Sequence, residues 1–269
     1  MANFGVVTSF TFATVPMPQL TVFQLGFAGA AVTEVLGGWQ GFTATAPDEL
    51  WSTMGISSGN PPTCRVNGCF VGTPAQANPL VDALVAATGA HPATRTVAAK
   101  GYLDAMRYFG GCSQYSVAQC HPSWNGSGEL GRESFVASSR IMAKPLADPG
   151  RVADLLTGPA GVDVLLDSIG GAAGRVAPTD TAFPHRGSLA SAQIYAATTP
   201  AAAGAATQRV AEVRSALGEL VGATGYVNYI DAAMPDWATA YYGGNLERLR
   251  QVARTYDPDR VFGFGQGLA

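Results

Sequence analysis

The sequence predicts a single α+β domain in which a large antiparallel sheet is flanked by helices. Short runs rich in Val, Ile, Thr and Phe alternate with longer amphipathic segments along the chain. The 269 residues include 33 Gly and 17 Pro, which is typical of many turns between short elements. With 47% hydrophobic and 13% charged residues, the chain has enough apolar material for a substantial core. We find no linker, internal repeat or low-complexity tract.

The first half of the chain predicts four strand regions and three helices. Residues 4–25 are rich in Val, Thr and Phe but contain Pro16 and Pro18, so we expect a strand, a proline bend and a second strand there. Thr73, Pro74 and Gln76 form a helix start, because Thr73 can cap the helix and Gln76 can complete a capping box. The other elements expected in this half are a helix at 30–42, strands at 50–56, 63–71 and 95–99, and a helix at 102–109.

The second half begins with a long loop at 112–131 and then returns to alternating strands and helices. Residues 133–142 alternate in polarity, as a strand with one buried face does. The further elements expected are a helix after Asp148, strands at 162–169, 174–177 and 189–197, a helix at 200–221, a short strand near Tyr226, and helices near 235–242 and 245–256.

Composition excludes several classes of function. The net charge of -3 offers no basic patch for a nucleic-acid partner. No apolar run reaches the roughly 20 residues that a membrane span needs, and residues 1–7 lack the pattern of a secretory signal, so we expect a cytoplasmic protein. Cys112 and Cys120 flank a polar loop and could close a small disulfide, although free buried thiols are the default expectation. No set of residues has the spacing of a metal site.

Candidate catalytic residues lie in a loop between two predicted strands and in the strand that follows it. Pro184 constrains the loop that carries His185, which makes this loop a good platform for an imidazole; the alternative is that His185 only satisfies backbone groups. In the strand at 189–197, alternation places Ser191, Gln193 and Tyr195 on one face. That face could line a substrate pocket or could simply be exposed to solvent.

The segment after residue 224 is dense in aromatic and amide side chains. In the short strand expected there, Tyr226 and Asn228 share one face while Tyr229 and Asp231 lie broadly opposite. These side chains supply donors and acceptors for a planar polar ligand, or they form a structural aromatic cluster. The glycine-rich run at 170–174 lacks the full dinucleotide fingerprint and is not interpreted as one.

Several motifs in fixed order resemble one known family. Residues 3–8 read Asn-Phe-Gly-Val-Val-Thr, and residues 181–186 read Thr-Ala-Phe-Pro-His-Arg. The tail contains Gly225-Tyr226-Val227-Asn228-Tyr229, then Tyr241-Tyr242-Gly243-Gly244-Asn245, and ends with Asp257-Pro258, Phe262 and Gln266. Together these stretches resemble the substrate domain and carboxyl-terminal signature of the berberine-bridge-enzyme-like FAD-linked oxidases.

The resemblance implies a substrate domain whose antiparallel sheet faces the flavin ring. It implies one unit over residues 1–269, in which 1–8 and 225–269 resemble the parts that pack on the flavin domain. The family's flavin contacts correspond to Asn3, Gly5, Val6, Tyr226 and Asn228, and the histidine matching His185 lies near the reaction centre. Family members oxidise sugars, alkaloids and other natural products by hydride transfer to FAD, and often cyclise the product.

The family's nucleotide-binding module would precede Asn3, and its motifs are not found in this sequence. We therefore expect no cofactor for this chain alone, and FAD only if a partner chain supplies the module. The first functional hypothesis is a truncated, cofactor-independent enzyme of natural-product biosynthesis. It would cyclise a polyketide-like substrate, for example by a [4+2] cycloaddition as a Diels-Alderase does, or isomerise it. The residues expected to polarise that substrate are His185, Tyr226, Tyr195, Gln193 and Tyr229.

Other hypotheses remain open at this point. The chain could be the carboxyl-terminal half of a two-chain or fragmented FAD-dependent oxidoreductase, or a non-catalytic protein that binds a hydrophobic metabolite. A homodimer is expected, because a sheet face left uncovered by a missing half would otherwise expose a large apolar surface.

Overall fold

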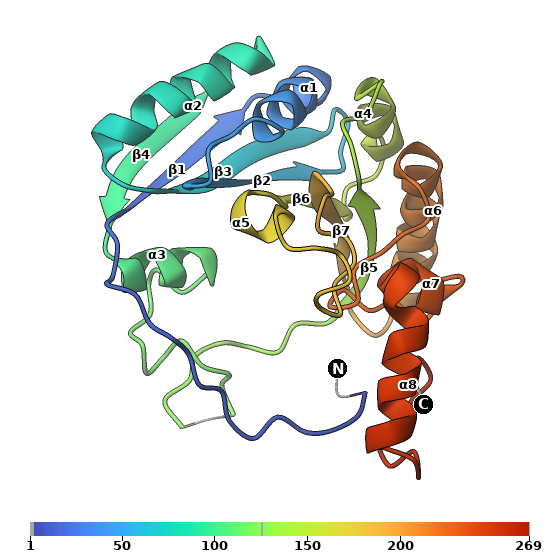
Figure 1. Cartoon of the computed structure of the whole chain (residues 1–269). Helices are drawn as coiled ribbons and strands as arrows, with labels where there is room; N and C mark the ends of the chain where they lie inside the picture. Colours follow the sequence, from blue (N-terminus) through green and yellow to red (C-terminus); the bar gives the residue numbers. More distant parts are fainter. Residues whose placement is uncertain (1–2, 125, 269) are drawn as a thin grey trace.

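The computed structural model describes residues 3–124 and 126–268, and it contains the predicted antiparallel sheet flanked by helices (Figure 1). The described residues form one 7-stranded sheet with the order β4-β1-β3-β2-β6-β7-β5, and all paired strands are antiparallel. The strands are β1 (Leu20–Phe27), β2 (Leu50–Ser57), β3 (Thr63–Val71), β4 (Thr94–Lys100), β5 (Phe135–Met142), β6 (Asp163–Ser168) and β7 (Ala190–Ala197). The α-helices are α1 (Val32–Thr43), α2 (Pro74–Thr88), α3 (Tyr102–Phe109), α4 (Gly150–Leu156), α5 (Gly171–Gly174), α6 (Ala203–Val221), α7 (Trp237–Tyr242) and α8 (Leu246–Tyr256).

The two halves of the sheet repeat one arrangement that the sequence does not reveal. The first half runs β1-α1-β2-β3-α2 and the second runs β5-α4-β6-β7-α6, with the short α5 inserted before β7. In each half the third strand lies between the first and the second, and pairing of β2 with β6 joins the halves. β4 lies beside β1, and in the second half the chain after α6 runs beside β5, where the amide of Ile141 donates to the carbonyl of Thr224 at 3.1 Å. The repeat therefore brings the tail of the chain to the edge of β5.

Helices α1, α2, α4 and α6 cover one face of the sheet and enclose the main core (Figure 1). Phe23, Leu36 and Met54 are completely buried there. Each such side chain contributes about 1.5–3 kcal/mol when it leaves water. The indole nitrogen of Trp39 donates to the hydroxyl of Ser52 at 2.9 Å, so the largest side chain of this core leaves no polar group unpaired.

The opposite face of the sheet carries hydrogen-bonding side chains in register. Cross-strand pairing aligns Gln24 with Asn67, Asn67 with Thr53, Thr53 with Asp167, and Asp167 with Ser191. Directly paired residues point to the same side of a sheet. These residues therefore form one polar row across five strands, and the helix-poor face becomes the candidate ligand-binding face.

One local prediction is confirmed, and one default expectation is corrected. Helix α2 begins with a complete capping box, in which the amide of Gln76 donates to the Thr73 hydroxyl at 3.3 Å and the amide of Thr73 donates to the Gln76 side chain at 3.0 Å. The default expectation of free thiols holds for Cys64 and Cys69. It is wrong for Cys112 and Cys120, which form the disulfide that their spacing allows.

Three predicted strands are wrong, each for a structural reason. Residues 5–19 form no strand, because Pro16 and Pro18 cannot donate to a ladder and these residues pack on no neighbouring strand. Residues 171–174 form helix α5 instead of leading into a strand at 174–177. The segment at Tyr226 is a turn, closed by the amide of Tyr229 donating to the Tyr226 carbonyl at 3.0 Å.

None of the helices that the described residues form combines the length and hydrophobicity needed to cross a bilayer. Within the same residues, no cluster of His, Cys, Asp and Glu has the arrangement of a metal site.

Gly68 tests the packing between β3 and its neighbours. A Cβ atom at this position would lie 2.2 Å from the Phe23 ring and 2.6 Å from the Trp51 carbonyl oxygen, so Gly68→Ala overpacks the core. We expect it to lower the free energy of unfolding by about 1–3 kcal/mol in urea titrations. Gly41→Ala is the matched control, because nothing lies within 4 Å of its Cβ. The control should be stabilising by about 0.5–1 kcal/mol, since Gly41 lies within α1. If the two substitutions changed the free energy of unfolding equally, the close packing of Phe23 and Trp51 against Gly68 would be contradicted.

Candidate functional site

A cavity of about 720 Å³ opens on the polar side of the sheet. This volume suits a small-molecule ligand. Its walls come from the loop between α1 and β2, the ends of β2 and β6, helix α5, the loop before β7, and the turn at 226–229. The lining residues are Thr43, Ala46, Pro47, Asp48, Leu50, Trp51, Ser52, Asp167, Ser168, Ile169, Gly170, Gly171, Ala172, Ala173, Phe183, Arg186, Ser191, Tyr226 and Tyr229.

Four aromatic rings line the cavity, and three of them are in mutual contact. The Tyr226 ring meets the Tyr229 ring edge-on, with centroids 5.2 Å apart, and meets the Phe183 ring in the same way at 5.6 Å. Trp51 adds a further ring from β2, which itself packs edge-on against Phe109 of α3 at 5.4 Å. Such edge-to-face pairs are favourable beyond their buried area. The wall is therefore a rigid surface against which a planar ligand can lie.

Asp167 and Tyr229 form the polar centre of the cavity. The Tyr229 hydroxyl donates to Asp167 Oδ2 at 3.3 Å. Burial raises the pKa of Asp167, and hydrogen bonds from Thr53 and Tyr229 offset part of that rise. Burial, together with the nearby Asp167 charge, raises the pKa of Tyr229 to about 12. A carboxylate with a raised pKa that is bonded to a phenol in a cavity is a candidate acid–base pair.

Sequence analysis identified Tyr229 but missed Asp167. The available signal was a carboxylate directly after the apolar residues 164–166, near the end of a predicted strand. A charge at that place is uncommon in a buried strand unless it is paired.

The turn at 226–229 places the rings of Tyr226 and Tyr229 on the side of the cavity. The Ser139 hydroxyl on β5 accepts from the amide of Tyr226 at 2.8 Å and donates to its carbonyl at 3.3 Å. Because the segment is a turn, the predicted alternation that put Tyr226 and Tyr229 on opposite faces is wrong. Both rings line the cavity.

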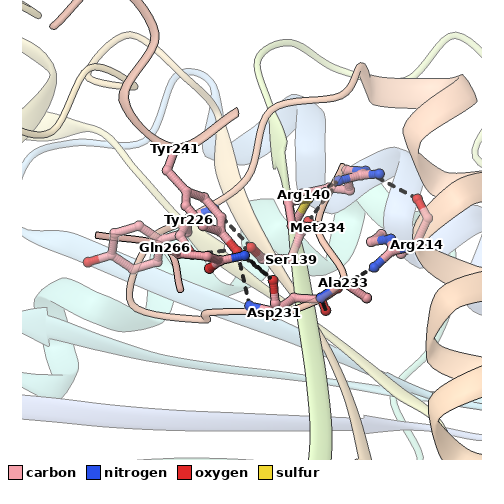
Figure 2. Close-up of polar contacts among 9 residues, drawn as sticks. All are labelled: Ser139, Arg140, Arg214, Tyr226, Asp231, Ala233, Met234, Tyr241 and Gln266. Atoms are coloured by element: carbon pink, nitrogen blue, oxygen red, sulfur yellow. Dashed lines mark hydrogen bonds and ion pairs between the residues drawn. The ribbon is translucent and has the colours of Figure 1, made fainter. Parts of the chain in front are cut away.

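An ion pair anchors this turn to helix α6 (Figure 2). Arg214 donates to Asp231 Oδ2, and each of the two side chains is only 11% exposed. The other oxygen, Oδ1, accepts from the amide of Ala233 at 2.8 Å. A pair so little exposed is screened weakly by solvent, so it fixes where the turn ends.

The backbone of Asp231 is bound on both sides as well (Figure 2). Its amide donates to the Tyr241 hydroxyl at 3.0 Å, and its carbonyl accepts from Gln266 Nε2 at 2.8 Å. Residues from α7 and from the end of the chain thus meet at one residue. Asp231 therefore joins Tyr241 and Gln266, two residues of the tail motif.

Arg140 of β5 lies buried beneath the same network (Figure 2). Its Nε donates to the Arg214 carbonyl at 3.1 Å, and its Nη1 lies 3.3 Å from the Ser139 carbonyl and 3.1 Å from the Met234 sulfur. Burial and the Arg214 charge lower the pKa of Arg140, while Asp231 opposes that shift. The Asp231 carboxylate therefore compensates two cations, which makes it costly to remove.

His185 lies against the tail and is not among the described residues that line the cavity. Its ring packs edge-on against Phe183 at 5.5 Å, and its Nε2 is buried without a hydrogen-bond partner. Burial lowers its pKa, an effect that nearby backbone groups partly offset. These groups belong to Tyr241, Gly225 and Ala240. A neutral imidazole behind Phe183 supports the aromatic wall.

Gln193 and Tyr195 share the sheet face of Ser191 but lie further along β7. Ser191 lines the cavity, whereas Tyr195 lies four residues and thus about 13 Å away along the strand. Its hydroxyl donates to Glu133 at 3.4 Å, and its ring packs on Phe135 at 5.3 Å. The structure does not bring these two residues to the Asp167–Tyr229 pair.

Of the predicted flavin-contact residues, only Tyr226 lines the cavity. Asn3 Nδ2 donates to the Tyr242 hydroxyl at 3.2 Å, while its Oδ1 is buried without a partner. Asn228 is exposed, and its Nδ2 donates to the Tyr226 hydroxyl at 2.7 Å. Val6 is 71% exposed, and a Cβ at Gly5 would meet nothing within 4 Å.

These residues fit part of an FAD molecule. Amide groups of Asn3 and Asn228 beside an open backbone suit the edge and face of a planar ring that carries donors and acceptors. The glycine-rich run at 170–174 opens only the four-residue helix α5, which is too short to hold a pyrophosphate at its N-terminus. The exposed groups of these residues are thus suited to a planar ring, and helix α5 is not suited to a pyrophosphate.

The described residues thus form an antiparallel sheet with one helix-covered face and one polar face at which the cavity opens. A family model described as "Berberine and berberine like" matches residues 225–269. The uncharacterised FAD-linked oxidoreductase YgaK of Bacillus subtilis is 30% identical over 99% of this chain and 56% of its own length.

Solved structures share the fold. A structure of chitooligosaccharide oxidase matches with a TM-score of 0.84 at 24% identity, covering 99% of this chain and 59% of that one. BBE-like 1 of Physcomitrella patens matches with a TM-score of 0.81 at 23% identity, covering 94% and 54%. The chain thus spans about half the length of the relatives it matches. Over nearly its whole length it resembles one half of the berberine-bridge-enzyme-like FAD-linked oxidoreductases.

The ion pair at Asp231 provides a stability test. Asp231→Asn leaves Arg214 and Arg140 without their compensating charge, so we expect a loss of about 3 kcal/mol in the free energy of unfolding. The control is Arg250→Gln, which breaks the exposed pair with Glu247 and should change stability by less than about 1 kcal/mol. Thermal and urea unfolding of both variants measure the difference. A loss at Asp231 no larger than the control would show that the pair does not anchor the tail.

Proposed function

We propose that this chain supplies the substrate-binding half of a flavin-dependent oxidation site, and that the substrate presents a hydroxyl group to Tyr229. The observation that carries the proposal is the Asp167–Tyr229 hydrogen bond inside the cavity, beside the residues that fit a flavin ring. The similarity to FAD-linked oxidoreductases over nearly the whole chain supports it.

The pair can remove a proton from a substrate by a two-step relay. The phenol oxygen of Tyr229 accepts the proton of the substrate hydroxyl while its own proton passes to Asp167. Burial favours this direction, because it raises the pKa of Asp167 and makes the carboxylate a better proton acceptor. The high pKa of Tyr229 keeps the phenol protonated and ready to donate to Asp167 at the start of the reaction.

The other lining residues orient the substrate. The rings of Trp51, Phe183 and Tyr226 hold it in place and exclude water. A flavin bound at the face of Asn3 and Asn228 would supply the hydride acceptor. The phosphates and adenosine need a binding module other than the residues described here.

The surface around residues 6–17 suits contact with such a module. Its large apolar side chains are between 65% and 81% exposed, namely Val6, Val7, Phe10, Phe12, Val15 and Met17. An exposed apolar segment of this kind marks an interaction surface. A second copy of the chain could cover it instead, so the homodimer stays a prediction.

The second candidate is a cofactor-independent ring closure or isomerisation of a polyketide-like substrate. The cavity volume and the rigid aromatic wall favour it, because confinement alone can accelerate a cyclisation. Of the residues first assigned to this reaction, Tyr226 and Tyr229 face the cavity, whereas His185, Gln193 and Tyr195 are not among its lining residues. Simple sheltering of a hydrophobic metabolite would use the same wall but would not need the Asp167–Tyr229 pair.

The three functions can be separated by the absorption spectrum of the protein and its turnover of a precursor. For this test the protein is purified from its native host together with any chain or ligand bound to it. We expect the visible absorption band of oxidised flavin, and we expect a hydroxylated substrate to bleach that band without oxygen. Colourless protein that converts a linear precursor into a ring would replace the oxidation with the second candidate. Colourless protein that only binds its ligand would leave the sheltering role.

The pH profile of turnover tests the relay. The carboxylate form of Asp167 accepts the proton, so kcat should rise as pH rises through the raised pKa of Asp167. Asp167→Asn should lower kcat by about 10²- to 10⁴-fold, because it removes the proton acceptor. Thr53→Val removes a hydrogen bond that lowers the pKa of Asp167, so it should move the acid limb to higher pH.

Thr96→Val is the matched control for Thr53→Val. Thr96 lies on β4 at the far end of the same polar row, paired with Gln24, and is exposed. Its profile should coincide with that of the unaltered protein. If the acid limb of the kcat profile moved in neither variant, Asp167 would not be the proton acceptor.

A further inference from the structure

We propose that the cavity binds a substrate carrying an anionic group, most simply a carboxylate, against the guanidinium of Arg186. The inference rests on the proposed function only in taking the cavity as the substrate site. It adds the substrate's charge and the place where that charge binds.

The wall of the cavity contains one cation that is not part of an ion pair within the described residues. Three charged residues contribute to its wall: Asp48, Asp167 and Arg186. Asp48 is already paired with Arg175, at 2.6 Å. Asp167 is bonded to the hydroxyls of Tyr229 and Thr53, and burial raises its pKa. Asp167 therefore has hydroxyl donors but no cationic partner, and Arg186 is the one cation among the described lining residues.

Arg186 has few partners for its donors. Its Nη2 donates to the Thr181 hydroxyl at 2.7 Å, and its guanidinium lies 5.2 Å from the centre of the Phe183 ring. Its Nε is buried without a hydrogen-bond partner. Among the described residues, no carboxylate lies within ion-pair distance of it. A guanidinium held in this way is complementary to a planar anion such as a carboxylate.

The loop that carries Arg186 is held in place by the tail of the chain. Asn245 Nδ2 donates to the carbonyls of Pro178 and Thr181, at 2.8 and 3.0 Å. Arg248 Nη1 donates to the carbonyl of Thr179 at 3.1 Å. Because these bonds fix the loop before any ligand arrives, little conformational entropy is lost when an anion binds.

The two polar ends of the cavity together define a substrate class. Arg186 receives the anionic end, and Tyr229 with Asp167 receives a hydroxyl. Between them lie the rings of Phe183 and Tyr226, which are suited to an apolar or planar body. The geometry points to a hydroxy acid whose acidic and hydroxyl groups are separated by an apolar or aromatic framework.

A pair of isosteric probes tests this inference without any turnover. The probes are 4-(hydroxymethyl)benzoate and its neutral amide, 4-(hydroxymethyl)benzamide, titrated into the full chain and followed by ligand-observed NMR. We expect the acid to bind roughly tenfold more tightly than the amide, as one added charge-assisted contact implies. The preference should shrink as salt is added, because ions screen a partly exposed charge.

Three variants assign the preference to Arg186. Arg186→Gln should bind the acid and the amide equally, whereas Arg186→Lys keeps the charge and should retain part of the preference. Arg254→Gln is the control for net charge, because Arg254 lies exposed in the last turn of α8, and it should keep the full preference. Unchanged unfolding curves confirm that each variant is folded.

The outcomes separate this inference from the proposed function. Equal binding of acid and amide by the unaltered chain, or a preference that survives in Arg186→Gln, would overturn the anion site while leaving the oxidation untouched. A preference lost only in Arg186→Gln supports the site, even if the flavin experiment fails.

Discussion

The two-residue period of the antiparallel strands is the constraint on which the rest of this structure depends. Each strand sends alternate side chains to opposite faces. One face is buried under α1, α2, α4 and α6, while the other collects the row that runs from Gln24 through Thr53 to Asp167 and Ser191. A shift of one residue in β6 would bury Asp167 among apolar side chains and would remove the acid–base pair from the cavity.

The sheet supplies only half of the site, and the tail supplies the other half. The chain after α6 runs beside β5, in the place that corresponds to β4 in the first half of the sheet, and the hydroxyl of Ser139 holds the turn there. The Arg214–Asp231 pair fixes the end of that turn. The hydroxyl of Tyr229 consequently meets the carboxylate of Asp167 across 62 positions of sequence.

Local signals made most of the fold predictable. The capping box of Thr73 and the alternation in β5 depend only on neighbouring residues, so their elements were placed correctly. The segment at 5–19 has strand-like composition but no partner strand, and partners are not visible in local sequence. The motif at 225–229 identified Tyr226 and Tyr229 as site residues, but not the turn that brings them together. Asp167 and Arg186 become recognisable only when the register of the sheet and the cavity are known.

The ionisation of Tyr229 tests the central claim most directly. Tyrosine labelled at Cζ with carbon-13 reports each phenol by NMR, and Tyr229→Phe assigns the signal. Burial and Asp167 place the pKa of Tyr229 at about 12, so its signal should shift only after ordinary tyrosines, with pKa values of about 10, have ionised. In Asp167→Asn the pKa should fall, because the neighbouring charge is gone. A Tyr229 that titrates as an ordinary tyrosine, identically in both proteins, would show that the pair is not formed and would contradict the account.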